Sequence, residues 1–393
     1  MIFVGIDIAS EKHDFYITND CGEFYKKRSV TISNNLDGYE KLHKAINDFC
    51  GVHNDFEVRI GLESTGFYHL NLLTYLSEKG FVTYLINPLL IKRFKESQSV
   101  HSAKTDNLDS KSICKYIESH IDELKTYTIE SYHTESLKSL SRERFYLIQD
   151  LKKCKLAIYK LLTNLFPEYL ELFSTVYTVS ALNIIERYPS PSKLAKAHSS
   201  TIEGMLHKRC KTTAEEIIKV AKNSVGIDEK CLSFQLLQEI KKLKFIQSQV
   251  DSYDDIILEY VTKVNKELLS VPGIGSVTAG LIIGEIGDIN NFSNSDKLIS
   301  FAGLDLRVYE SGKYKLKKAR PTKKGSSYLR YALFQVARNI WKFDSRFKEY
   351  YDNKQAQGTH YYVILGHIEN KLVKIIYSIL KNKKEYYTYV PQK

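Results

Sequence analysis

The sequence has few cysteines, and none has the spacing of a metal-binding or disulfide motif. Six cysteines are scattered from Cys21 to Cys231, and no two form a Cys-x-x-Cys pair. The pattern excludes a zinc ribbon and does not match the disulfide framework of a small secreted domain. We therefore expect a protein of a reducing, cytoplasmic compartment.

Three further motifs are missing from the sequence. No run of about 18 apolar residues is present, so we expect no membrane span. The first residues, MIFVGIDIAS, lack the basic region of a signal peptide and continue directly into a strand pattern. The opening also resembles that of sugar kinases, but no second glycine-rich phosphate loop and no GxxxxGK[ST] motif follow, which argues against a kinase.

The balance of charge favours an anionic partner. Lysine and arginine number 57 against 46 acids, which gives a net charge of +11 and a pI near 9.0. Nucleic acid is the leading candidate partner for such a chain. The length of 393 residues predicts two or three domains, and the 43% hydrophobic content is ample for their cores.

The first 125 residues have an α/β pattern. Helices are predicted over 36–50, 67–79 and 106–119. Three strands in succession, followed by strands that alternate with helices, indicate a mixed sheet. The predicted strands cover 2–8, 14–18, 24–31, 57–63 and 81–86.

Residues 126–269 have a helical pattern. Apolar positions at helical spacing over 134–166 and 233–269 predict two long helices that pair as an antiparallel coiled-coil arm. The residues between them, 167–232, read as a small helical insertion at the tip of the arm.

A third, mainly helical domain is predicted over 270–393. Its expected helices cover 276–287, 294–301, 325–341 and 361–380. The sequence VPGIG places Gly273 and Gly275 in a turn between helical stretches, where backbone N–H groups could approach a phosphate as in a helix–hairpin–helix. A tight turn between helices without any ligand is the alternative.

Four carboxylates occupy positions typical of a nuclease core. Asp7 lies near the end of the first strand and Glu63 ends a later one, while Asp106 and Asp109 share a helical face. Such a cluster predicts Mg²⁺ or Mn²⁺, since hard cations prefer oxygen ligands, and two such ions can assist phosphodiester chemistry. The order of the acids on a mixed α/β pattern favours a ribonuclease-H-like core. Each acid alone could instead be a turn residue or a helix cap.

A basic segment with three serines covers 307–330. It holds one acid near its start and is otherwise cationic. Serine needs a base, a metal or cationic surroundings to become a nucleophile, and composition does not choose among Ser311, Ser326 and Ser327. The last two also suit a helix N-cap, and Tyr309 is a rival hydroxyl. The cations that we expect to contact phosphates are Arg307, Lys313, Lys315, Lys317, Lys318, Arg320, Lys323 and Lys324.

Several motifs resemble those of the DEDD transposases of the IS110 insertion-sequence family, the RNA-guided recombinases of the bridge-RNA type. The matching stretches are VGIDIASEKHDF (4–15), GLESTGFY (61–68), VTYLINP (82–88), KTDNLDSKSI (104–113), VPGIGSVTAGLI (271–282), and SFAGLDLRVYESG with TKKGSSYLRYAL, both within 300–333. They occur in family order and cover nearly the whole chain except 167–232.

The resemblance implies a RuvC-like domain over 1–125 whose DEDD set is Asp7, Glu63, Asp106 and Asp109, all binding Mg²⁺. It also implies a C-terminal transposase domain in which Ser311, in YESG, is the nucleophile that forms a covalent phosphoserine link with DNA.

The resemblance also implies the partners of the protein. The expected partners are donor and target double-stranded DNA and a structured guide RNA that pairs with both. Homodimers would assemble into a homotetramer, in the cytoplasm of a prokaryote and on the nucleoid when bound to DNA. Two alternatives remain: a RuvC-like metal-dependent junction endonuclease that uses water, or a nucleic-acid-binding protein without catalysis.

Overall fold

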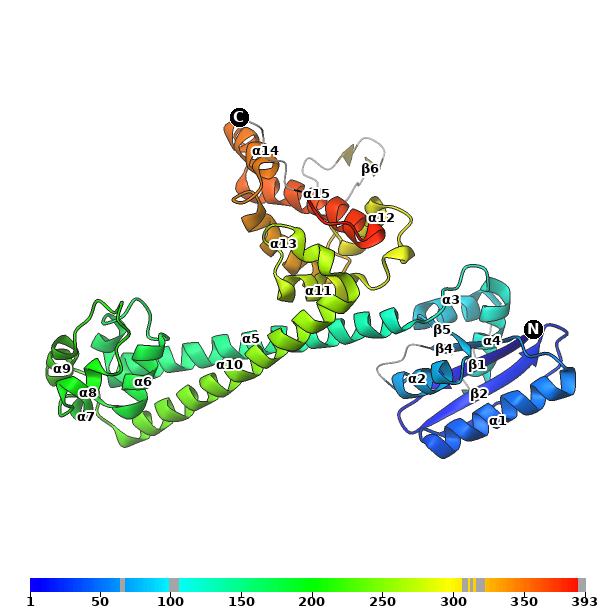
Figure 1. The fold of residues 1–393 in the computed structure, drawn as a ribbon, viewed down its shortest axis with the longest axis horizontal. Coiled ribbons are helices and arrows are strands. Elements are labelled where there is room, and N and C mark those ends of the chain that lie inside the picture. The colour runs from blue at the N-terminus through cyan, green and yellow to red at the C-terminus, as the bar shows by residue number, and fades with distance from the viewer. Residues whose placement is uncertain (64–67, 99–105, 306–309, 312–313, 316–321, 388–393) are drawn as a thin grey trace. The chain divides into compact units, whose positions relative to one another are not determined.

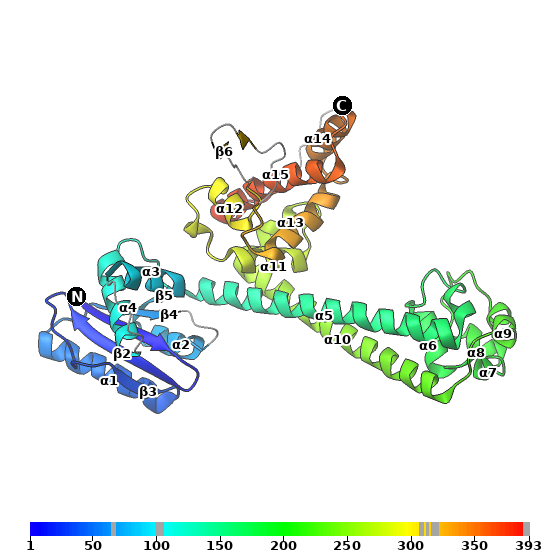
Figure 2. The ribbon, with the colours of Figure 1, turned by 180° about the vertical axis from the view of Figure 1, so that it is seen from behind.

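The computed structural model describes residues 1–63, 68–98, 106–305, 310–311, 314–315 and 322–387 (Figures 1 and 2). Residues 98, 106–108, 129–130, 310–311 and 314–315 are described by their backbone alone. The chain packs as two compact units, Met1–Tyr132 and His133–Lys393. None of the described helices is long and apolar enough to cross a membrane.

The first unit is built on a five-stranded sheet of order β3-β2-β1-β4-β5. β1 (Ile2–Ile8), β2 (Lys12–Asn19) and β3 (Val30–Ser33) are antiparallel, whereas β4 (Val58–Glu63) and β5 (Val82–Ile86) are parallel to β1. This arrangement confirms the predicted mixed sheet. The strand predicted over 24–31 is wrong in its bounds. Phe24 forms a single bridge with Thr18 of β2, the exposed Lys26, Lys27 and Arg28 lie outside any strand, and β3 begins only at Val30.

Helices cover both faces of this sheet. Ile2, Val4 and Ile6 of β1 face one way and share a buried cluster with α1 (Leu36–His53) and α2 (Leu70–Glu78). Phe3 faces the other way and packs with α3 (Pro88–Gln98) and α4 (Asp106–His120). The alternation follows from the two-residue period of a strand. The sequence did not predict α3, which begins at the proline expected only to end β5.

Two glycines bring α4 directly onto the sheet. A Cβ added at Gly5 of β1 would lie 2.2 Å from the carbonyl oxygen of Ser110, and one added at Gly61 of β4 would lie 2.3 Å from Ile117 Cδ1. Gly5 and Gly61 lie opposite each other in the parallel pair of β1 and β4, so together they form one flat surface against which α4 packs. No other residue type leaves room for this close approach.

The second unit begins within α5 (Ile129–Leu165), which lies beside α10 (Lys230–Asn265) in both views (Figures 1 and 2). Leu151, Ile158 and Leu162 of α5 share a buried cluster with Leu236 and Ile240 of α10. The insertion between them adds to this cluster. Its helices are η1 (Pro167–Leu170), α6 (Val179–Arg187), α7 (Pro191–Leu194), α8 (Ser199–Glu203) and α9 (Ala214–Lys222). Coiled-coil supercoiling of the pair stays a prediction.

The remaining residues of the second unit are mostly helical, as predicted. Their elements are η2 (Lys266–Ser270), α11 (Ser276–Ile286), η3 (Ile289–Asn291), α12 (Ser295–Ala302), β6 (Glu310–Ser311), β7 (Tyr314–Lys315), α13 (Ser327–Ile340), α14 (Ser345–Ala356) and α15 (Tyr361–Asn382). The sequence missed α14, whose exposed surface leaves little apolar periodicity to read. The predicted division at residues 125 and 269 stays a prediction.

Two glycines of α11 allow this helix to pack closely against α5 and α10. A Cβ at Gly280 would lie 2.6 Å from Ile257 Cγ2 of α10, and one at Gly284 would lie 2.5 Å from the backbone nitrogen of Lys138 on α5. The four-residue spacing puts both glycines on one face of α11. This face fixes the C-terminal helices against α5 and α10.

We expect Gly5→Ala to lower the free energy of unfolding of the first unit by about 1–3 kcal/mol, because its methyl group would collide with the backbone of α4. Gly51→Ala, in α1, is the matched control: nothing lies within 4 Å of its Cβ, and alanine favours a helix by up to about 1 kcal/mol. Thermal unfolding measures both. Equal effects of the two substitutions would contradict the close packing of α4.

Glu369, on α15, makes stability depend on pH. Burial raises the pKa of this carboxyl from 4.5 to about 7, against an opposing influence of Arg330. The folded state therefore binds a proton that the unfolded state releases, and the free energy of unfolding falls as pH rises from about 4.5 to about 7. Glu369→Gln should stabilise the protein by up to about 3 kcal/mol at pH 8 and by clearly less at pH 5. Melting curves at the two pH values check this, and a gain independent of pH would refute it.

Candidate nuclease and strand-transfer site

Two of the four predicted acids lie side by side on the sheet. Ile6 of β1 pairs with Leu62 of β4, so the next position aligns Asp7 with Glu63. Both residues are half-buried. Asp7 lies two residues after Gly5, and Glu63 lies two residues after Gly61. Because alternate residues of a strand point to the same face, both side chains lie on the face that α4 covers.

The start of α4 lies at the same end of the sheet. Its residues Ser110 and Cys114 lie over Gly5, and the Cys114 thiol donates to the carbonyl oxygen of Phe3. The helix therefore runs against β1, and its first turn extends past Gly5 toward Asp7. Asp106 is the first residue of α4 and is described by its backbone alone. The first turn of α4, which carries Asp106 and Asp109 in its backbone, therefore extends toward the carboxyl ends of β1 and β4, where Asp7 and Glu63 lie.

Asp109 already has a cationic partner. The Nζ of Lys95, on α3, lies 2.6 Å from Asp109 Oδ1, and both side chains are about one-third exposed. An ion pair of this exposure contributes little to stability. Its significance is positional, because it places a lysine beside one of the four predicted acids. No sequence pattern indicated a role for this lysine, since α3 itself was not predicted.

Asp14 is a further acid beside the predicted set. It pairs with Asp7 across the β1–β2 hairpin, which puts both on one face of the sheet, and it accepts a hydrogen bond from Thr31. The sequence pattern could have identified Asp14, because Asp7 and Asp14 are equally far from the turn of the hairpin and therefore pair across it.

The donor set is chemically suited to a hard cation, since it consists of carboxylates at the end of a sheet. Among the side chains that the structure describes, no three His, Cys, Asp or Glu residues are already arranged to hold a metal ion. The side chain of Asp106 lies outside that description. Metal binding by Asp7, Glu63, Asp106 and Asp109 is therefore a proposal.

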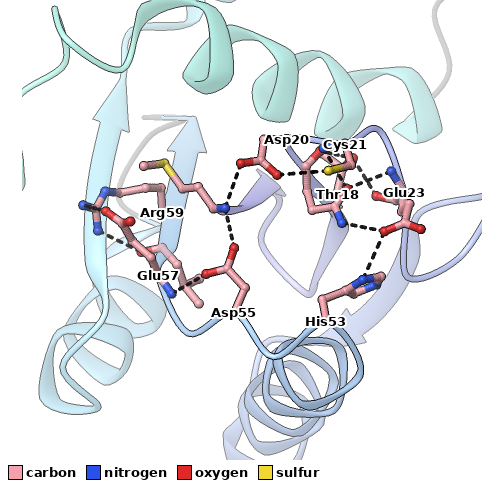
Figure 3. Close-up of polar contacts among 11 residues, drawn as sticks. Thr18, Asp20, Cys21, Glu23, His53, Asp55, Glu57 and Arg59 are labelled. Carbon is pink, nitrogen blue, oxygen red and sulfur yellow. Dashed lines mark hydrogen bonds and ion pairs between the residues drawn. The ribbon is translucent and has the colours of Figure 1, made fainter.

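The amino-terminal end of the same sheet has a different electrostatic character (Figure 3). There the Met1 ammonium contacts Asp20 and Asp55, Arg59 pairs with Glu57, and His53 contacts Glu23. The ammonium lowers the pKa of both the Asp20 and Asp55 carboxyls. Asp20 and Asp55 are balanced by the Met1 ammonium and Glu57 by Arg59, so these carboxylates have structural partners within the chain.

Ser311 lies in a short hairpin of the second unit. It belongs to β6, where it pairs with Tyr314 of β7, and its side chain is not described. Of the predicted phosphate contacts, Lys315 is described by its backbone alone, while Lys323 and Lys324 are exposed. Five others, and Tyr309, lie outside the described residues: Arg307, Lys313, Lys317, Lys318 and Arg320.

The two ends of the segment that carries this hairpin are held together. The guanidinium of Arg330 donates to the carbonyl oxygens of Ala302, at 3.1 Å, and Gly325, at 2.7 Å. The Thr322 backbone N–H and hydroxyl both donate to Asp305. These contacts form a closed neck at the base of the segment.

Lys323 lies in this neck with an unfavourable backbone. Its φ is 54°, in the left-handed region, and its N–H donates to the carbonyl oxygen of Gly303. A side chain costs about 1–2 kcal/mol in this conformation, where glycine costs little.

A buried carboxylate anchors the helix that follows the neck. Ser326 is the N-cap of α13 and accepts from the Leu329 N–H, while its hydroxyl donates to Glu285 at 2.7 Å. Glu285 is 4% exposed and also takes two hydrogen bonds from Arg142 of α5. The cap predicted for Ser326 is confirmed, whereas Ser327 is the first helical residue.

The PGIG turn connects η2 to α11. Gly273 has a φ of 87°, and Gly275 is the N-cap residue of α11. Phosphate binding by either glycine stays a prediction.

Two family models match the chain. One, for the DEDD transposase of the IS110 type, matches residues 4–167, and one for the transposase IS116/IS110/IS902 family matches residues 265–352. Both describe transposases, and together they cover more than half of the 393 residues. The chain belongs to the IS110 family of transposases.

Individual relatives are distant. The chain is 23% identical over 323 residues to the mini-circle putative transposase for IS117 of Streptomyces coelicolor, covering 77% of this chain and 75% of that protein. It is 22% identical to an uncharacterized protein of insertion element IS110 from the same organism, covering 53% of each. Among solved structures it is similar to Thermus thermophilus RuvC in complex with a Holliday junction substrate, at 11% identity and a TM-score of 0.24, over 32% of this chain and 99% of that one.

We expect Ser326→Ala to lower the free energy of unfolding by about 1–2 kcal/mol, since it removes a helix cap and one hydrogen bond to a buried carboxylate. Ser327→Ala, one position along, should change stability by no more than about 0.5 kcal/mol. Thermal melts of the two variants check this. A smaller effect at Ser326 than at Ser327 would show that the cap does not hold α13.

Proposed function

We propose that this transposase cuts and rejoins DNA strands through a covalent link to Ser311, assisted by a divalent cation on its DEDD carboxylates. The alignment of Asp7 with Glu63, beside the start of the helix that carries Asp106 and Asp109, is the observation that supports this most. The family match states only that the enzyme is a transposase.

In the proposed reaction the Ser311 oxygen forms a bond to a DNA phosphorus, and one ester bond of that phosphate breaks to leave a strand with a free hydroxyl. The serine gives up its proton and the leaving oxygen gains one. A hydroxyl from another strand then attacks the phosphoserine and releases Ser311. Each step exchanges one phosphate ester for another, so no nucleotide cofactor is needed.

Asp7, Glu63, Asp106 and Asp109 would hold Mg²⁺ or Mn²⁺. The chemistry that such an ion supplies is neutralisation of phosphate charge and a lower pKa of the attacking hydroxyl. Lys323 and Lys324 would hold the DNA backbone. The strained backbone of Lys323 supports a use for its side chain, because glycine would suit that conformation better.

The remaining partners belong to the same proposal. A structured RNA from the element would pair with donor and target DNA, and residues 167–232 would take part in binding it or in dimerisation. Dimers would pair into a tetramer, with the acids of one subunit completing the serine site of another. The net charge of +11 supports binding to polyanions of both kinds.

The test is to trap the covalent intermediate. Protein, Mg²⁺, DNA carrying the ends of the element and the RNA encoded beside the gene are mixed, then denatured and separated by size. We expect protein joined to one DNA strand. Ser311→Ala should abolish the adduct, Asp7→Asn should reduce all strand cleavage by at least about 100-fold, and Ser327→Ala should keep both.

Other outcomes point elsewhere. Cleavage by the wild type that leaves no adduct would support a water-using endonuclease, and an adduct formed by Ser311→Ala would make another residue the nucleophile. DNA binding with no cleavage under any metal or RNA would contradict the enzyme mechanism entirely.

A further inference from the structure

Four aromatic side chains form a preassembled surface on α5 and α13 of the second unit. We name Phe145, Tyr146, Tyr328 and Tyr331 the aromatic platform. The Phe145 ring lies edge-on to Tyr328 at 5.2 Å and to Tyr331 at 5.3 Å, and the hydroxyls of Tyr146 and Tyr328 are 2.6 Å apart. Rings fixed by such contacts lose little conformational freedom when a ligand binds.

The platform is open to solvent. Tyr146 is 51% exposed and Tyr331 is 42% exposed, whereas Phe145 and Tyr328 are half-buried beneath them. The guanidinium of Arg142 lies 4.8 Å from the centre of the Tyr328 ring and is itself fixed by Glu285. The two exposed rings, Tyr146 and Tyr331, are therefore packed against side chains that are themselves held in place.

The charge beside the platform favours a polyanion. From Ser311 to Phe343 the sequence has ten lysines and arginines and no acid. Lys323 and Lys324 are exposed directly before α13, so Lys324 is within about 14 Å of Tyr328 along the chain. On α5, Glu143 is an exposed acid, and Asp150, four residues after Tyr146, has a half-exposed side chain that pairs with Lys153. A second copy of this chain would have to bring acids to the cationic side, whereas a nucleic acid brings them in every phosphate.

We propose that the aromatic platform binds an unpaired stretch of DNA strand, with bases stacked on Tyr146 and Tyr331 and the backbone held by Lys323 and Lys324. Exposed rings beside cations are the means by which proteins bind single strands, and a base inside a duplex has no free face to offer them. DNA is the substrate of a transposase, and a strand must leave its duplex to be exchanged.

The inference rests on the proposed handling of DNA but not on Ser311 or on a metal. Binding is therefore measured in EDTA, where a failure of the catalytic mechanism does not affect the result. The full chain is titrated into a 12-nucleotide single-stranded DNA that carries 2-aminopurine at its centre, into the matching duplex, and into RNA of the same sequence.

We expect Tyr331→Ala and Tyr146→Ala each to weaken single-strand binding by about 5- to 100-fold and to remove the quenching of 2-aminopurine by stacking. Duplex binding should change less than about 2-fold. Tyr331→Phe keeps the ring and should bind as the wild type does. Tyr159→Ala, at a tyrosine of α5 that is 49% exposed and 13 residues beyond Tyr146, is the matched control and should have no effect.

Lys324→Ala provides the electrostatic comparison. It should weaken single-strand and duplex binding alike and reduce the dependence of affinity on salt, which the tyrosine variants leave unchanged. Circular dichroism confirms that each variant is folded.

Four results would overturn the proposal. Wild-type binding by Tyr331→Ala would show that the ring is not used, and an equal loss on duplex DNA would exclude stacking of unpaired bases. Tighter RNA binding with the same sensitivity to Tyr331→Ala would assign the platform to RNA. A change in the mass of the assembly, measured by light scattering, with unchanged DNA affinity would assign it to contact between copies of this chain.

Discussion

The close approach of α4 to the sheet is the constraint on which the first unit of this protein depends. At Gly5 the backbone of α4 lies directly against β1, and at Gly61 the Ile117 side chain of α4 fills the space that a Cβ would occupy, so the two glycines fix how closely α4 packs on the sheet. This packing brings the residues two steps further along each strand, Asp7 and Glu63, to the first turn of the helix. The position of α4 relative to Asp7 and Glu63 therefore follows from a packing requirement in the neighbouring residues and not from interactions between the acids.

In the second unit, glycines also allow close packing of a helix, and this packing positions a buried carboxylate. Gly280 and Gly284 seat α11 on the backbone of α5 and on α10, and the next residue, Glu285, then reaches Arg142 and Ser326. A buried carboxylate with three hydrogen bonds is costly to disrupt, because any group left behind would lose its partner. This network sets the start of α13, and with it the neck of the segment that carries Ser311 and the position of Tyr328. Fixed geometry at these points is what phosphate chemistry and base stacking both require.

The residues of the proposed mechanism are divided between the two units. The carboxylates lie in the first, whereas the serine, most of the cations near it and the aromatic platform lie in the second. Within the first unit, the interaction of Lys95 with Asp109 balances one of these carboxylates.

Much of the site could be predicted from sequence because strands and helices place residues by simple periodicity. The apolar run of β1 predicts that Asp7 ends a buried strand, the spacing of Asp106 and Asp109 puts them on one helical face, and Ser326 before an apolar helix predicts a cap. The bounds of β3, the existence of α3 and α14, and the position of Lys95 were not accessible, because each depends on which neighbours cover a surface.

The sequence by itself determined the mixed sheet, the helical remainder, the four acids and the basic segment, since all of these follow from local pattern. Tertiary structure alone decided that Lys95 reaches Asp109 and that Glu285 holds Ser326. It also decided that Tyr146 and Tyr328, 182 residues apart, share one surface. Contacts between residues so distant in the chain are set by how whole helices pack, and no local pattern records that packing.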